Sequence, residues 1–406
     1  MDELRTAVED EARAANDALA ALADDGVQAA LSAAGALLEE RAATVLAANA
    51  ADMAGAAGRL DAGALDRLRL DDARLAAIRE QLRILAALPP LEREVDEWTL
   101  ENGLRVQERR IPVGVVGANF EARPNVAVDV AGQLLKSLNA ALLRTGGAAI
   151  RTVTALVDDV LRPALASAGL PPGAVGLVRS SERDGARILV SLPRLVPLVI
   201  LRGSGPTTAA LAQLAAENGV RTLAHAEGGG VLYVDASADP DRAAAIVEAS
   251  LDRLGVCNRL NLLLVDRTAD ALLPALRETL ARIGVAEADG PLGHEWANDA
   301  DRVATVTVHA VDGVAEAVAI ANGETSGLAA GVVADDAAVA RSFIDRYRGT
   351  AVFWHATTRF TDGFALTGSP ETGINVDNVP GPRGPVTYRD LSLRQYVVVG
   401  DATQRR

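Results

Sequence analysis

The feature that most constrains the fold is an alternation of two patterns that runs from residue 113 to residue 334. Short apolar segments, such as VGVVGA at 113–118, PLVILRG at 197–203 and LNLLLVD at 260–266, are separated by longer segments with the apolar period of a helix. Strands without polar alternation are typical of a parallel sheet that is buried on both faces and connected by helices. The sequence therefore predicts an α/β fold.

The length of the chain and the position of its strands indicate more than one domain. A chain of 406 residues exceeds the roughly 250 to 300 at which a single hydrophobic core stops growing. One series of strands ends near residue 203, and a second series begins with GGVLYVD at 229–235. We therefore expect two doubly wound α/β domains.

Two further segments lie outside this alternation. Residues 3–90 have the period of three helices, separated by DDG at 24–26 and by the glycines near Gly58 and Gly63. A short alternating strand at 104–110 follows an Asn-Gly turn, and the tail TYRDLSLRQYVVVGD ends in a strand that can join it. Such strands have little core of their own, so they predict a β-flap that associates with a second copy of the chain.

Composition excludes several classes of partner. The net charge is −14, and no Lys/Arg cluster could neutralise the phosphates of a polynucleotide. The most apolar stretch, residues 188–201, is too short to span a bilayer and contains Pro193, Arg194 and Pro197. The first helix is acidic, unlike a signal peptide, and one cysteine permits no internal disulfide. We expect a cytoplasmic protein that binds neither nucleic acid nor membrane.

Cys257 is the first candidate for chemistry. It lies in DRLGVCNRLNLLLV, between the end of a predicted helix and the start of a buried strand. A thiol at such a junction can face a cleft, and backbone N–H groups nearby would stabilise its thiolate. The competing interpretation is a buried, inert cysteine.

Loops that follow the strands supply the other candidates. Glycine-rich turns suited to binding phosphate lie at Gly114 and Gly117, at Gly146 and Gly147, at Gly203 and Gly205, and at 228–230. None of them is a GxGxxG motif, and each can be an ordinary turn. The loop TRFTDG at 358–363 follows the apolar strand AVFWH and is placed to anchor a substrate. The four histidines have no metal-ligand spacing, so no metal is expected.

Taken in order, these segments resemble γ-glutamyl phosphate reductases, which are members of the aldehyde dehydrogenase superfamily. The resemblance runs along nearly the whole chain and rests on ERAATVLAANAADM, EWTLENGLRVQERRIPVGVVGANFEARPNVAVDVAGQLLKSLNA, GVCNRLNLLLVD, TRFTDG and RGPVTYRDLSLRQYVVVGD. It implies a nicotinamide nucleotide-binding domain (1–97 and 113–227), a catalytic domain (228–366), a β-flap (98–112 and 386–401) and a connecting segment (367–385). The active site would lie in the cleft between the two domains.

The resemblance also implies roles for particular residues. The Cys257 thiolate would attack an acyl phosphate, and NADPH would reduce the resulting thioester to an aldehyde. The backbone N–H of Cys257 and the side chain of Asn125 would stabilise the oxyanion. The groups implied to hold substrate or phosphate are Glu121, Arg123, Arg359, Thr361 and Asp362, and those implied to bind NADP(H) are Arg144, Gly146, Gly147, Gly203, Ser204 and Gly205. A glutamate kinase is the implied functional partner.

Several positions depart from the family pattern where cofactor and substrate should bind. Ala148 and Ala149 replace a Ser-Glu pair, Leu138 replaces a glycine, and Ala224 replaces a Glu before His225. The segment GETSGLAAGVVADD at 323–336 lacks the Gly-His-Thr of the family. The loss of that acid argues against simple oxidation of an aldehyde, in which the acid activates water. The departures leave two alternatives open: the same thioester chemistry on a different acyl phosphate or acyl-CoA, and a non-catalytic scaffold.

Overall fold

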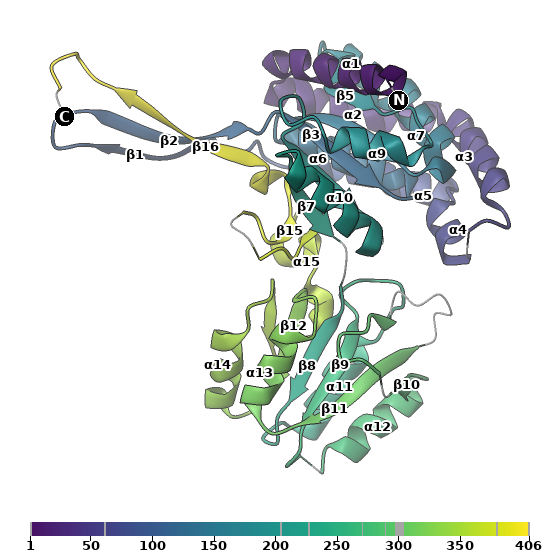
Figure 1. Cartoon of the computed structure of the whole chain (residues 1–406), viewed down its shortest axis with the longest axis vertical. Helices are drawn as coiled ribbons and strands as arrows, with labels where there is room; N and C mark the ends of the chain where they lie inside the picture. Colours follow the sequence, from purple (N-terminus) through teal and green to yellow (C-terminus); the bar gives the residue numbers. More distant parts are fainter. Residues whose placement is uncertain are drawn as a thin grey trace. The chain divides into compact units, whose positions relative to one another are not determined.

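The computed structural model describes residues 2–60, 62–203, 205–225, 228–269, 271–288, 290–296, 304–378 and 381–404. They form two compact units (Figure 1). Unit 1 comprises residues 1–224, 369–373 and 386–406, and unit 2 comprises residues 225–368 and 374–385. Each unit is an α/β structure, as the strand and helix alternation predicted.

Unit 1 is built on a five-stranded sheet in the order β5-β4-β3-β6-β7. The strands are β3 (Val115–Phe120), β4 (Ala140–Thr145), β5 (Val175–Leu177), β6 (Leu198–Arg202) and β7 (Arg221–His225). β3 pairs in parallel with β4 and β6, and β4 pairs in parallel with β5. All residues of β3, β4 and β5 are buried, which is why these segments show no alternation of apolar and polar residues and are polar only near the ends of β3 and β4.

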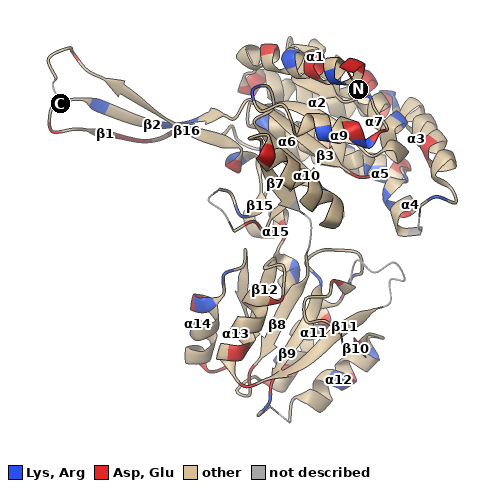
Figure 2. Cartoon of the chain, viewed as in Figure 1, with Lys and Arg blue, Asp and Glu red and all other residues tan. Residues whose placement is uncertain are grey.

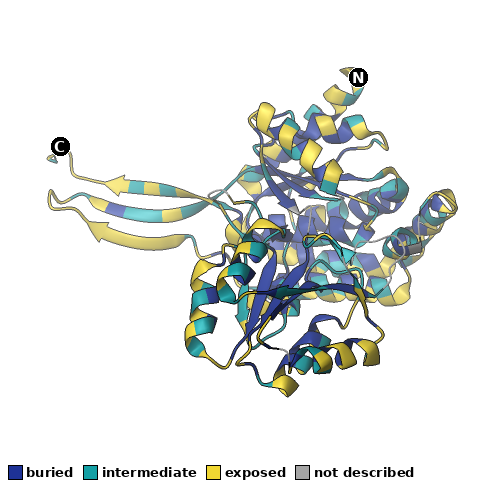
Figure 3. Cartoon of the chain, turned by 60° about the horizontal axis from the view of Figure 1, so that its bottom comes forward, coloured by how far each residue is buried: buried dark blue, intermediate teal, exposed yellow. Residues whose placement is uncertain are grey.

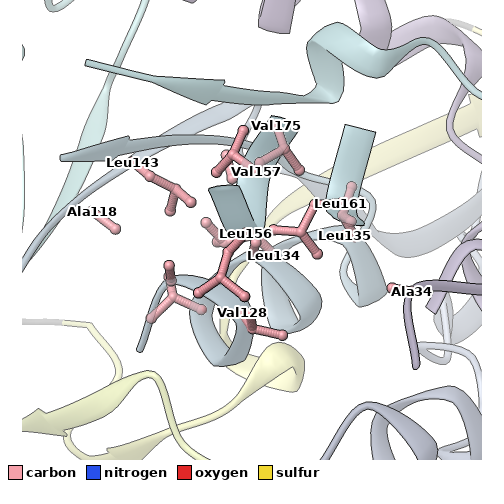
Figure 4. Close-up of a cluster of buried hydrophobic side chains, with 14 of the residues drawn as sticks. Ala34, Ala118, Val128, Leu134, Leu135, Leu143, Leu156, Val157, Leu161 and Val175 are labelled. Atoms are coloured by element: carbon pink, nitrogen blue, oxygen red, sulfur yellow. The ribbon is translucent and has the colours of Figure 1, made fainter. Parts of the chain in front are cut away.

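Helices cover both faces of this sheet. Val116, Ala118 and Phe120 of β3 point into one hydrophobic cluster, and Val115 points into another. The first cluster is closed by α2 (Asp24–Glu40), α3 (Ala42–Ala56), α5 (Asp72–Ala87), α6 (Pro124–Lys136), α7 (Ile150–Ala155) and α8 (Arg162–Ser167); part of it is shown in Figure 4. The second is closed mainly by α1 (Asp2–Ala18), α9 (Arg183–Leu189) and α10 (Gly205–Glu217).

The helical opening differs from the expectation of three helices, because five α-helices lie among the described residues before residue 90, with α4 at Ala62–Leu68. The DDG segment is not a break: it forms the first turn of α2, where Asp24 and Asp25 favour the positive end of the helix dipole. A separate helix, α5, starts at Asp72 because the Asp71 side chain accepts a hydrogen bond from the N–H of Arg74 at 2.8 Å.

The backbone departs from regular or expected geometry at two places, one after α6 and one after β4. Leu138 adopts a φ of 57°, the left-handed region that favours glycine, so the leucine at this position carries a strain of about 1–2 kcal/mol. The helix expected over 148–168 contains a π-helical segment at Leu156–Leu161. Pro163, the second residue after this segment, lacks a backbone N–H and removes one helical hydrogen bond.

Unit 2 contains a six-stranded parallel sheet in the order β10-β11-β9-β8-β12-β13. The strands are β8 (Gly230–Val234), β9 (Leu260–Asp266), β10 (Ala286–Ala288), β11 (Thr305–Val311), β12 (Ala329–Val333) and β13 (Val352–Trp354). One face packs on α11 (Pro240–Ser250) and α12 (Leu273–Arg282), and the other on α13 (Val314–Gly323) and α14 (Ala337–Arg346). The described chain therefore has two doubly wound sheets, as expected.

An antiparallel ribbon joins segments far apart in the sequence. β2 (Arg105–Pro112) pairs with β1 (Glu94–Thr99) on one side and with β16 (Ser392–Val399) on the other. The ribbon thus begins at Glu94, ahead of the boundary expected for the flap. Most of its residues are exposed (Figure 3), including Trp98 and Tyr396, whose rings meet edge to face at 6.0 Å. A separate two-stranded sheet is formed by β14 (Gly373–Asn375) and β15 (Gly384–Val386).

Charged residues are spread over the helices instead of forming one basic stripe in the view of Figure 2. None of the helices in the described ranges is both long and apolar enough to cross a membrane.

A buried tyrosine ties together the carboxyl ends of the two central strands of unit 2. The Tyr233 hydroxyl lies 2.9 Å from Asp235 Oδ2 and 3.0 Å from Asp266 Oδ2. The other carboxylate oxygens accept hydrogen bonds from the backbone and hydroxyl groups of Ser237 and Thr268. Burial, together with the hydrogen bond to Asp235, raises the pKa of Tyr233 above its ordinary value.

We predict that Tyr233→Phe lowers the free energy of unfolding by about 1–3 kcal/mol, because two carboxylates lose their hydroxyl donor. Tyr347→Phe is the matched control: both rings stack on Phe343, but the buried Tyr347 hydroxyl has no partner among the described residues. Its removal should change stability by less than about 0.5 kcal/mol. Urea unfolding at pH 7 compares the two variants, and equal losses would contradict this account of Tyr233.

Candidate active site

Cys257 lies in the loop between α11 and β9, at the amino edge of the unit 2 sheet. It is half-buried and packs against a small apolar cluster of Leu328, Ala329 and Ile374. It is therefore neither a fully buried core cysteine nor a freely exposed one. Partial exposure at a strand end is the setting that reactive thiols require.

The glycine turn at 228–230 approaches the Cys257 loop more closely than any side chain would allow. A Cβ on Gly228 would lie 2.6 Å from Cys257 Cβ and 2.6 Å from the Cys257 carbonyl oxygen. The N–H of Gly229 donates to that carbonyl oxygen at 2.5 Å, and the N–H of Gly230 donates to the carbonyl oxygen of Arg259 at 2.6 Å. The role of this turn is thus to hold the cysteine loop against β8, a role that the sequence did not reveal.

The structure also brings the TRFTDG loop to the cysteine loop. The Asn258 amide nitrogen donates to the carbonyl oxygens of Arg359 and Thr361, both at 3.0 Å. In return, the Thr358 hydroxyl donates to the Asn258 carbonyl oxygen at 2.9 Å. Two segments about a hundred residues apart in sequence therefore form one hydrogen-bonded structure.

Each of the three residues predicted in this loop has a distinct environment. Arg359 donates from Nε to Asp252 at 2.6 Å and from Nη1 to Asn258 Oδ1. Asp362 caps α15 (Gly363–Thr367) by accepting from the N–H of Ala365 at 3.2 Å. The Thr361 hydroxyl is buried and has no partner among the described residues. Asp362 thus caps a helix with one carboxylate oxygen, whereas the Thr361 hydroxyl has hydrogen-bonding capacity left over.

Arg259, two residues after Cys257, is a further charged group that was not singled out from the sequence. Its side chain is fully buried, and Nη1 donates to the carbonyl oxygen of Thr305 at 2.8 Å. Nε and Nη2 have no partner within the described ranges. Burial lowers the pKa of Arg259 to about 10, and the charge of Asp252 opposes this effect.

In unit 1, the predicted residues Glu121, Arg123 and Asn125 follow β3 at the carboxyl edge of its sheet. Arg123 is the N-cap residue of α6, and Asn125 lies in the first turn of that helix. The Asn125 amide donates to Asp129 Oδ2 at 3.3 Å. Burial raises the pKa of Asp129 to about 6, although the Arg202 charge and the Asn125 hydrogen bond oppose it.

The predicted cofactor residues lie at the same edge. Arg144, at the end of β4, donates to Asn119 Oδ1 at 3.2 Å and to the Glu182 carbonyl oxygen at 2.9 Å. Its Nε and the Thr145 hydroxyl are buried and lack partners among the described residues. Spare donors at the carboxyl ends of parallel strands fit a dinucleotide, whose phosphates are acceptors.

The neighbouring glycines serve different purposes. A Cβ on Gly147 would lie 3.1 Å from Ser181 Cβ, and one on Gly203 would lie 3.1 Å from Glu121 Oε1. Gly146 has more room, because its nearest neighbours would lie at 3.7 Å or beyond. Gly205 begins α10, and Ser204 lies outside the described residues. The glycines therefore allow close packing of loops at this edge.

The alanines that depart from the family pattern occupy buried or half-buried positions. Ala149 is fully buried in the turn that leads into α7, beside Ala148, and Ala224 belongs to the second core cluster of unit 1. No carboxylate stands at these three positions, so a water-activating acid cannot act from residue 224.

We predict that Gly228→Ala slows alkylation of Cys257 by at least about tenfold, because the new methyl group displaces the cysteine loop. Gly323→Ala, at the end of α13, is the control, since no atom lies within 4 Å of its added Cβ. Iodoacetamide alkylation followed by mass spectrometry measures both. Equal rates in the two variants would show that the close approach does not position the thiol.

We also predict opposite pH effects for two aspartates. Since Asp129 has a folded pKa of about 6, above its ordinary 3.8, its stabilising contribution is complete below about pH 4 and is lost as the pH rises through 6. Asp129→Asn should therefore raise the free energy of unfolding by about 1–3 kcal/mol more at pH 8 than at pH 4.5.

Asp266 provides the contrast. Burial alone would raise its pKa, but the hydrogen bonds from Thr268 and Tyr233 outweigh burial and lower it. Its stabilisation is present above the ordinary carboxyl pKa and is lost as the pH falls below it, so Asp266→Asn should destabilise the protein at pH 8. Urea unfolding at both pH values tests the pair, and shifts of the same sign would refute the assignment.

Comparisons with known proteins identify similar chains. Residues 2–295 match the model of the Aldehyde dehydrogenase family. A γ-glutamyl phosphate reductase of Clavibacter michiganensis is 38% identical over 421 residues, covering 100% of this chain and 96% of the relative. One of Moorella thermoacetica is 35% identical over 413 residues, covering 97% of each.

Solved structures agree with these sequence matches. The crystal structure of γ-glutamyl phosphate reductase from Thermotoga maritima has a TM-score of 0.91 at 27% identity, covering 98% of this chain and 100% of that chain. An acetylating aldehyde dehydrogenase from Geobacillus thermoglucosidasius has a TM-score of 0.71 at 15% identity, which shows a shared fold alone. The likeness extends over both units and the ribbon.

Proposed function

Since the chain belongs to the γ-glutamyl phosphate reductases of the aldehyde dehydrogenase family and is an oxidoreductase of the aldehyde group, we propose that it reduces γ-glutamyl 5-phosphate to glutamate-5-semialdehyde and phosphate. This is a step of the proline-biosynthesis type. The observation that carries the proposal is the environment of Cys257, a half-buried thiol held at a strand end by the 228–230 turn and the 358–361 segment.

The proposed chemistry uses the Cys257 thiolate twice. The thiolate attacks the carbonyl carbon of the acyl phosphate, a C–S bond forms, and the bond to the phosphate oxygen breaks. After hydride adds to the thioester carbon, the C–S bond breaks, the thiolate leaves and the aldehyde is released. The backbone N–H of Cys257 and the side chain of Asn125 are the proposed donors to the oxyanion.

The family implies a nicotinamide cofactor, which supplies the hydride when it is bound. We propose NADP(H), held by Arg144, Gly146, Gly147 and residues 203–205. The spare donors at Arg144 and Thr145 support this placement. The replaced pair at Ala148 and Ala149 removes two polar groups from the same turn, so the remaining contacts must come from Arg144 and backbone N–H groups.

The residues proposed to hold the substrate are Glu121, Arg123, Arg359, Thr361 and Asp362. Thr361 has the best support among them, because its buried hydroxyl has no partner in the described part of the chain. Arg359 can bind an anion with the donors that Asp252 and Asn258 do not engage.

A different acyl substrate is the second proposal, and one observation favours it. The changes at Leu138, Ala148, Ala149 and Ala224 fall in unit 1 and that in GETSGLAAGVVADD falls in unit 2, whereas the cysteine loop and the TRFTDG loop keep the family pattern. An enzyme that keeps the thioester chemistry but recognises a different acyl substrate would have this combination of retained and changed segments.

Assembly and location complete the proposal. The exposed apolar residues of the ribbon support a homo-oligomer in which the ribbon joins subunits. Delivery of a short-lived acyl phosphate favours a glutamate kinase as the functional partner. The single cysteine fits the reducing cytoplasm as the place of action.

We predict that the purified protein reduces NADP+ when glutamate-5-semialdehyde and phosphate are supplied together, and that Cys257→Ala abolishes this turnover. Absorbance at the nicotinamide band measures the rate. Omission of phosphate is the control, because without an acceptor for the acyl group the thioester cannot turn over. No turnover of the wild type, together with no NADP(H) binding by calorimetry, would reject the proposed function.

A further inference from the structure

We propose that Asn258 is a positioning residue whose side-chain amide locks the Cys257 loop to the 358–361 segment and so sets the geometry in which the thiolate reacts. This inference rests on the proposed role of Cys257 as nucleophile. It adds a residue that acts through the contact between the two loops.

The side chain of Asn258 makes three hydrogen bonds inside the protein. It is only 6% exposed, and Nδ2 donates to the carbonyl oxygens of Arg359 and Thr361 at 3.0 Å. Oδ1 accepts from Arg359 Nη1. A primary amide offers two N–H donors and one carbonyl acceptor, so one small side chain binds the backbone and the guanidinium of the opposite segment together.

The residues on either side of Asn258 are held from another direction. The carbonyl oxygens of Cys257 and Arg259 accept from the N–H groups of Gly229 and Gly230, at 2.5 Å and 2.6 Å. The cysteine loop is therefore bound to the glycine turn through its backbone and to the 358–361 segment through Asn258. Removal of the Asn258 amide would leave the bonds from the glycine turn and the bond from the Thr358 hydroxyl to the Asn258 carbonyl oxygen, but none from the Asn258 side chain to the 358–361 segment.

The pattern of donors makes asparagine difficult to replace. Aspartate keeps an acceptor for Arg359 but directs carboxylate oxygens at the carbonyl oxygens of Arg359 and Thr361, which then have no donor. Alanine removes all of the side-chain bonds. Asn258→Asp and Asn258→Ala therefore separate the contribution of the amide donors from that of the contact with Arg359.

The chain has a single cysteine, so alkylation reports on one thiol without background. The experiment measures the iodoacetamide rate of Cys257 from pH 6 to pH 9, together with kcat and KM for the proposed reaction. We expect Asn258→Ala and Asn258→Asp to move the pH–rate profile and to lower kcat by about 100-fold, with a smaller change in KM.

Asn49→Ala is the matched control. Asn49 is a buried amide of unit 1 that donates to the carbonyl oxygen of Leu68 at 2.9 Å and accepts from the N–H of Leu70 at 2.8 Å. Its loss removes the same kind of contact, so the unfolding midpoint should fall as in Asn258→Ala, while the alkylation profile and kcat stay those of the wild type.

A wild-type alkylation profile and kcat in Asn258→Ala would overturn the inference, as would an equal fall of kcat in Asn49→Ala. If Asn258→Ala does not fold, Asn258→Asp tests the amide donors alone, since it replaces Nδ2 and keeps an acceptor for Arg359; an unchanged profile there would also count against the inference. If the wild type does not turn over the proposed substrate, the proposed function fails, whereas the alkylation measurement still decides the role of Asn258.

Discussion

The approach of the 228–230 backbone to the Cys257 loop is the contact on which the catalytic unit depends. Any side chain at Gly228 would overlap the cysteine itself, and one at Gly230 would lie 2.5 Å from the Thr358 hydroxyl oxygen. Glycine is therefore the residue that permits the loop before β8, the loop before β9 and the TRFTDG segment to meet. The entropic cost of three flexible residues is offset by the hydrogen bonds that they make to the cysteine loop.

The two parallel sheets provide the rigid support for these loops. In each unit, alternate residues of the central strands enter hydrophobic clusters on opposite faces, and helices close both. In unit 2, the Tyr233 hydroxyl ties the carboxyl ends of β8 and β9, whereas the cysteine loop occupies their amino ends. Fixing both ends of the two central strands limits the motion available to the thiol.

Charged groups are buried near the functional loops, and the burial of each charge lowers the stability of the folded protein. Burial lowers the pKa of Arg259 to about 10 and raises that of Asp129 to about 6, in both cases by disfavouring the charged form. Perturbed groups of this kind concentrate where proteins perform chemistry, and both lie close in sequence to proposed active-site residues, Cys257 and Asn125.

The amino-acid sequence by itself determined the α/β class, the two doubly wound sheets and the family. Apolar runs of strand length and long motifs in a fixed order are local patterns, so they can be recognised in the sequence without knowledge of the three-dimensional structure. It also selected Cys257 and the TRFTDG loop as candidates. It missed the extra helices before residue 90, because no glycine or proline marks the break at Arg41 between α2 and α3, and because α4 contains Gly63, a residue typical of a turn. Only the tertiary structure decided that Asn258 bridges two segments a hundred residues apart, that Asp362 is a helix cap, and that the 228–230 glycines serve the cysteine loop. These facts depend on which backbone atoms meet in space, and hydrogen bonds between distant segments leave no periodic trace in the sequence.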